Sequence, residues 1–172
     1  MLSKNIESVL NKQVRIEAES SQVYLSMACW AETHGLEGVA QFMYRQSDEE
    51  RQHMLKLIKY VNERGGHAII TDLKPPKTSF GTFKEMFEEL YQHELFVSNS
   101  INELVHIAFD EKDYATHNFL QWYVAEQIEE EAQAKTILDK INLIGDDKGG
   151  LYLFDRDIQQ ITVRSASAVG KN

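Results

Sequence analysis

The chain has 172 residues, of which 42% are apolar and 26% are charged. This composition excludes a disordered or collagen-like protein and fits one domain with a substantial core. The 18 basic and 27 acidic side chains give a net charge of −9, which argues against nucleic acid or an anionic membrane as the main partner. The single cysteine, Cys29, excludes a disulfide framework and a multi-cysteine metal site. We find no secretory signal and no apolar run of about 20 residues, so we expect a soluble, cytoplasmic protein.

Helical periodicity predicts four long helices, at residues 5–33, 36–64, 80–109 and 113–142. Gly35 and the pair Gly65-Gly66 follow the first two, where a glycine supplies the left-handed residue that ends a helix. A shorter amphipathic stretch predicts a fifth helix at 151–163. The small and polar residues 165–172 are expected to form a loose tail.

The link between the second and third helices, residues 65–79, contains the only two prolines, Pro75 and Pro76. A helix of about 28 residues is about 42 Å long, and fifteen extended residues reach about 50 Å. This link can therefore cross the whole length of the helices, whereas the short links join antiparallel neighbours. We predict an all-α arrangement of one domain over residues 1–172: an up-down-down-up four-helix bundle with one long crossover. The apolar run 68–70 indicates that the crossover lies on the surface of the bundle.

Each long helix interrupts its apolar stripe with one central glutamate. In the third helix seven of the eight inward positions are apolar, and the exception is Glu94. The corresponding acids in the other helices are Glu17, Glu50 and Glu130. A buried carboxylate is unfavourable unless it is paired, and no lysine or arginine occupies these stripes. A bound cation would neutralise the four acids together.

The spacing of neighbouring side chains strengthens this interpretation. His53 follows Glu50 by three residues, on the same helix face, and Gln127 and Glu130 repeat that spacing. Carboxylates with one imidazole suit iron or manganese, although zinc can also bind, and several acids favour a dinuclear site. A single inward glutamate could be a misjudged helix face, and an E-x-x-H spacing alone is common on solvated helices. Four central acids, one in each helix, favour metal binding.

At these residues the chain resembles a ferritin, specifically a bacterial-type non-haem ferritin. The segments that carry the resemblance are EAESSQVY at 17–24, DEERQH at 48–53, YQHE at 91–94 and AEQIEEE at 125–131. A ferritin-like bundle with helix carboxylates, an E-x-x-H pair and one long crossover has this organisation. The resemblance implies a hollow shell of 24 subunits that oxidises Fe(II) with O2 or H2O2 and stores Fe(III) mineral.

The resemblance also implies roles for individual residues. Glu17, Glu50 and His53 would hold one iron, and Glu50, Glu94 and Glu130 a second, with Glu50 as the bridge and Gln127 close by. A third iron site would involve Glu49, Glu126, Glu129 and Glu130. Tyr24 and Trp122 match the aromatic residues beside the iron pair and could carry electrons, although ordinary core packing would also explain them.

Differences between this sequence and related families narrow the kind of ferritin-like protein that we expect. Gln127 and Glu130 stand where a symmetric di-iron protein has a second E-x-x-H pair, so the two metal positions should be unequal. Bacterioferritins bind haem through a methionine where this chain has Gln52, and Met54 lies two places on, so we expect no haem. One cysteine excludes the cysteine-rich iron domain of rubrerythrins. The small ferritins that protect DNA build their site between subunits and lack this set of acids.

Two other functions remain open at this stage. The first is a di-iron oxidase or peroxidase without a storage role. The second is a plain helical interaction bundle with no catalytic activity.

Overall fold

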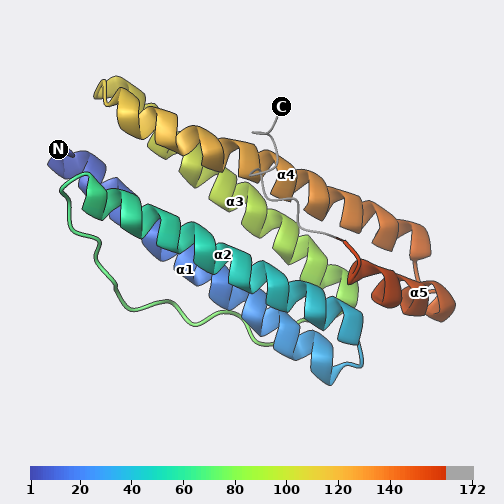
Figure 1. The fold of residues 1–172 in the computed structure, drawn as a ribbon. Helices are drawn as coiled ribbons and strands as arrows, with labels where there is room; N and C mark the ends of the chain where they lie inside the picture. The colour runs from blue at the N-terminus through green and yellow to red at the C-terminus, as the bar shows by residue number, and fades with distance from the viewer. Residues whose placement is uncertain (162–172) are drawn as a thin grey trace.

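A computed structural model describes residues 1–161 and contains five helices. They are α1 (Lys4–Thr33), α2 (Glu37–Glu63), α3 (Phe83–Asp110), α4 (Tyr114–Ile144) and the short α5 (Lys148–Ile158). Figure 1 shows α1 to α4 as a bundle, with the crossover running along its length and α5 across one end. The predicted all-α four-helix bundle with one long crossover and a short fifth helix is confirmed. The four long helices begin and end within three residues of the predicted bounds. No helix in the described part of the chain is long and apolar enough to cross a membrane.

The core of the bundle is divided into two apolar clusters. One cluster, near α5, includes Met27, Met43, Phe87 and Ile137. The other, toward the opposite end, includes Leu10, Leu57, Val97, Ile101 and Leu120. The four central glutamates fall between these two groups along every helix. Apolar packing above and below therefore holds the polar layer in place and keeps it away from water.

The crossover follows α1, and polar side chains hold it there (Figure 1). Asn11 donates to the His67 carbonyl at 3.0 Å and accepts from the Ile69 amide at 2.7 Å. Glu7 accepts from the His67 amide, and Glu19 accepts from the Lys74 amide. Ala68 is half-buried and packs against the core, whereas Ile69 and Ile70 are 51% and 72% exposed, so only the first residue of the apolar run is held by burial.

The prediction from the apolar pattern placed the short fifth helix too far along the chain. It begins at Lys148 rather than at residue 151 because the Asp147 carboxylate accepts hydrogen bonds from the amides of Gly149 and Gly150. That N-cap offsets the low helix propensity of the two glycines. The helix ends at Ile158, five residues before the predicted bound. The predicted tail, residues 165–172, lies outside the described residues.

Helix α5 also completes the start of α2. Side chains of Ser3, Thr82 and Asp113 cap α1, α3 and α4, but the N-cap of α2 is Leu36, which has no side-chain acceptor. Asp155 of α5 supplies it by accepting from the Val39 amide at 2.9 Å. A Cβ atom at Gly38 would lie 1.7 Å from the Asp155 carbonyl oxygen, so only glycine permits this approach.

We expect Asp155→Ala to lower the free energy of unfolding by about 1 kcal/mol, the usual cost of removing an N-cap side chain. Chemical denaturation followed by circular dichroism measures this change. Asp157→Ala is the matched control, since Asp157 is exposed and pairs with its neighbour Arg156. Equal stability of the two variants would show that α5 does not cap α2.

Candidate metal centre

The structure buries all four central acids, one from each long helix. Glu17, Glu50, Glu94 and Glu130 are between 1% and 4% exposed. They occupy the inward stripes that the periodicity predicts, because residues three or four apart lie on one helix face. Lysine and arginine are absent from their hydrogen bonds and ion pairs within residues 1–161.

Glu17, Glu50 and His53 form the tightest group. Each offers a ligand atom, and these atoms all lie within 4.8 Å of one another. His53 Nδ1 lies 3.5 Å from Glu50 Oε2. Among the described residues, Glu17 Oε2 and Glu50 Oε2 have no hydrogen-bond partner. Buried carboxylate oxygens without a donor are the kind of orphaned atoms that a cation satisfies.

Glu94 and Glu130 lie beside this group and are held by neutral donors. The Tyr24 hydroxyl donates to Glu94 Oε1 at 2.6 Å, and Gln127 Nε2 lies 3.3 Å from Glu94 Oε2. Gln46 Nε2 donates to Glu130 Oε2 at 3.0 Å. Neither acid belongs to a group of three ligand atoms as close as the first one in the described part of the chain.

The four acids hold protons more tightly than exposed glutamates do. Burial raises the pKa of Glu17 and of Glu50 well above the usual range, and the negative charges of Glu50 and Glu94 respectively raise them further. Burial also raises the pKa of Glu94, against hydrogen bonds from Tyr24 and Gln127 that lower it. Glu130 has a raised pKa through burial and the charge of Glu94. Protons or a bound cation therefore stabilise the folded site relative to four ionised carboxylates.

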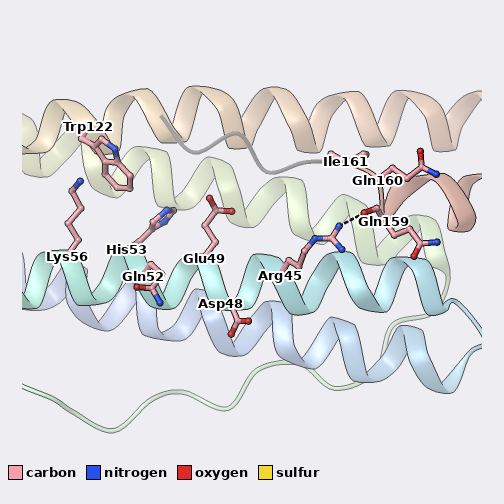
Figure 2. Close-up of a pocket in the computed structure, with 10 residues that line it drawn as sticks. All are labelled: Arg45, Asp48, Glu49, Gln52, His53, Lys56, Trp122, Gln159, Gln160 and Ile161. Atoms are coloured by element: carbon pink, nitrogen blue, oxygen red, sulfur yellow. Dashed lines mark hydrogen bonds between the residues drawn. The ribbon is translucent and has the colours of Figure 1, made fainter. Parts of the chain in front are cut away.

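A second group lies next to the first, on the side of a cleft of about 890 Å³. Ligand atoms of Glu49, His53 and Glu126 lie within 4.8 Å of one another. Figure 2 shows Glu49 and His53 extending from α2 toward α4, in the same cleft as Trp122. Burial raises the pKa of Glu49. Glu129 is exposed and is not part of this close group, although its negative charge is among those that raise the pKa of Glu49.

The two aromatic residues differ in their surroundings. Tyr24 is 1% exposed and bonded to Glu94, so its hydroxyl contacts the polar layer directly. The Trp122 ring packs edge-on against His53 with centroids 5.2 Å apart. Trp122 lines the cleft, and Lys56 Nζ lies 3.6 Å from its ring centroid. Both side chains also pack in or against the apolar clusters of the core.

The chain matches the family described as "Ferritin-like domain" over residues 7–144. It belongs to the ferritin family. A "Probable bacterial non-heme ferritin-like protein" of Haemophilus influenzae is 44% identical over 96% of this chain and 100% of that relative. A "Bacterial non-heme ferritin" of Campylobacter jejuni is also 44% identical, over 95% of this chain and 98% of its own. The "open pore ferritin" of Archaeoglobus fulgidus superimposes with a TM-score of 0.92 at 41% identity, covering 94% of this chain and 100% of its own.

Membership of the ferritin family confirms the resemblance stated from the sequence motifs. The motifs did not single out two further residues of this ferritin, Gln13 and Gln46, which are each 1% exposed and bonded to a central acid. A signal was present, since each glutamine stands four residues before an acid of the polar layer, Glu17 or Glu50, in the same inward stripe.

Proposed function

We propose that this ferritin oxidises Fe(II) at the buried acids and stores the Fe(III) product as mineral inside a multi-subunit shell. The convergence of Glu17, Glu50 and His53 within 4.8 Å, inside an otherwise apolar core, is the observation that carries the proposal. Carboxylate and imidazole ligands suit iron, and the carboxylates stabilise its higher oxidation state. Iron is the substrate and the stored product of this reaction.

The proposed ligand sets are those that the resemblance to ferritins implies, and the close group of Glu17, Glu50 and His53 supports the first of them. Glu17, Glu50 and His53 hold one Fe(II). Glu50, Glu94 and Glu130 hold the second, with Glu50 as the shared ligand and Gln127 beside Glu94. The free Oε2 atoms of Glu17 and Glu50 support this assignment. Gln127 and Glu130 stand where a symmetric di-iron site has a second glutamate and its histidine, and this difference makes the two iron positions unequal.

Two Fe(II) ions side by side supply two electrons in one event. O2 then takes up two electrons and two protons to give H2O2, or H2O2 takes up two electrons and two protons to give two molecules of water. The helices contribute by fixing the number and direction of the ligands before iron arrives. The apolar clusters on both sides exclude water from the pair.

We also propose that Glu49, Glu126 and Glu129, with Glu130, form a third iron position that relays iron away from the pair. The close approach of Glu49, Glu126 and His53 supports the inner part of this position. In this proposal Tyr24 and Trp122 carry electrons, which is supported by the hydrogen bond of Tyr24 to Glu94 and the packing of Trp122 against His53.

The proposed assembly is a shell of 24 copies in the cytoplasm. Large apolar side chains that stand exposed on the single chain support association with other copies; they include Phe96, Phe109, Tyr114, Ile128, Leu143 and Tyr152.

Electron microscopy of the purified protein after aerobic loading with Fe(II) tests the shell and the mineral together. We expect closed 24-subunit particles with electron-dense interiors. Isolated dimers that still oxidise Fe(II) rapidly would instead identify a di-iron oxidase without storage. A protein that neither oxidises Fe(II) nor binds it at Glu17, Glu50 and His53 would be a plain helical bundle.

A further inference from the structure

A chain of two hydrogen bonds leads from a surface groove to Glu17. Ser100 Oγ on α3 donates to Gln13 Oε1 on α1 at 2.7 Å, and Gln13 Nε2 donates to Glu17 Oε1 at 2.8 Å. Gln13 and Glu17 are each 1% exposed, whereas Ser100 is half-buried. Gln13 and Ser100 both line a groove of about 400 Å³ between α1 and α3.

The direction of both hydrogen bonds follows from the chemistry of the groups. A carboxylate that binds a metal is ionised and only accepts, so the atom of Gln13 that faces Glu17 in the metal-bound site must be its amide nitrogen. The carbonyl oxygen of Gln13 then faces Ser100 and requires a donor, which the Ser100 hydroxyl supplies. Ser100 can accept from water in the groove, so its proton remains available for Gln13. Each group in the chain therefore has one orientation that satisfies its neighbour.

In this arrangement the two carboxylate oxygens of Glu17 have different surroundings. Oε1 is engaged by Gln13, whereas Oε2 has no partner among the described residues. Glu17 is also the acid whose ligand atom lies within 4.8 Å of those of Glu50 and His53. A carboxylate with one oxygen held by an amide offers the other as a single-atom ligand in a fixed direction.

We propose that Gln13 and Ser100 are positioning residues that hold Glu17 as a one-oxygen ligand for the first iron. The inference rests on the proposed function and adds two residues to it. Gln13 acts through Glu17, and Ser100 acts through Gln13 by preventing its amide from rotating. Without them the Glu17 side chain can turn and present both oxygens, which changes the coordination number of the metal as well as its affinity.

Titration of the metal-free protein with Co(II), followed by visible absorption, tests this proposal. Co(II) reports coordination number through the position and intensity of its bands, and binding is measured without any iron oxidation. Glu17→Ala identifies the bands that belong to this position. Gln13→Met has a similar length but no hydrogen-bonding group, and Gln22→Met makes the same change elsewhere on α1.

We expect Gln13→Met to weaken Co(II) binding at this position by about 10- to 100-fold, the usual cost of losing an outer partner of a ligand. The Co(II) absorption bands of Gln13→Met should also weaken, because the coordination number of the metal rises. Ser100→Ala should shift the bands in the same direction with a smaller loss of affinity, and it tests the chain even if Gln13→Met does not fold. Gln22→Met should match the wild type.

The outcomes separate this inference from the proposed function. Wild-type binding and bands in both Gln13→Met and Ser100→Ala would overturn the positioning role and leave the iron site intact. If Glu17→Ala gives the same Co(II) spectrum as the wild type, Glu17 is not a metal ligand. That result would overturn the proposed iron site itself, and the positioning role with it.

Discussion

Replacing Glu50 with alanine is expected to slow the initial rate of Fe(II) oxidation by a factor of about 100 or more. Losing an outer partner of a metal ligand already costs about 10- to 100-fold, and Glu50 is a proposed ligand of both irons. Glu50 is 2% exposed, and its ligand atom lies within 4.8 Å of those of Glu17 and His53. Its loss removes the group that holds two Fe(II) ions at a fixed separation. Stopped-flow measurement of Fe(III) absorbance after mixing Fe(II) with aerated protein gives the rate.

Glu63→Ala is the matched control for this variant. It makes the same change on the same helix, but at an exposed position near the end of α2. We expect it to oxidise iron at the wild-type rate, and circular dichroism should show both variants folded. Rapid oxidation that survived in folded Glu50→Ala would mean that Glu50 does not bridge the two irons.

The metal-free protein is expected to lose stability as the pH rises above about 4.3, the pKa of an exposed glutamate. Burial raises the pKa of Glu17, Glu50, Glu94 and Glu130 above the value of about 4.3 for an exposed glutamate. The native state therefore holds protons that the unfolded chain has released. Stability from this source is complete below the unfolded pKa and is lost as the pH rises through the raised native values. For each proton that the native state retains and the unfolded chain has released, the free energy of unfolding falls by about 1.4 kcal/mol per pH unit.

Denaturation of the metal-free protein at several pH values measures this loss. Glu94→Gln should raise stability at pH 8 and flatten the dependence, because a neutral amide needs no proton in the same place. Glu103→Gln, an exposed change on the same helix, should follow the wild-type curve. Zn(II) at saturating concentration should restore wild-type stability most strongly at pH 8, since a bound cation replaces the protons. If the stability of the metal-free protein rose with pH, the prediction that the four central acids destabilise it when they ionise would be wrong.

Much of the bundle could be predicted because helical periodicity is a local property. Residues such as Leu90, Glu94 and Val97 share one face whatever surrounds them, so the burial of Glu94 could be predicted before any contact was known. The topology followed from the length of the crossover. The start of α5 was missed because Gly149 and Gly150 disfavour a helix locally, and the Asp147 cap offsets that cost.

The details of the site could not be predicted in the same way. Periodicity places Gln13, Gln46 and Gln127 on inward faces, but it does not say which acid each amide will reach. Gln46 bonds to Glu130 on α4, 84 residues away, and Ser100 of α3 orients Gln13 of α1. Such pairings depend on how the helices are rotated against one another. The same holds for Glu49 and Glu129, of which only Glu49 joins a close group of possible ligands.

The sequence by itself determined that four long helices each carry one acid into an apolar stripe, because residue spacing along a helix defines its faces. It also determined the family, through motifs whose order and spacing are specific. Only the tertiary structure decided which oxygens remain free, because the partners of Glu17, Glu94 and Glu130 come from packing between helices as well as from their own helix. Hydrogen bonds depend on distances of a few tenths of an ångström, and helix packing sets those distances.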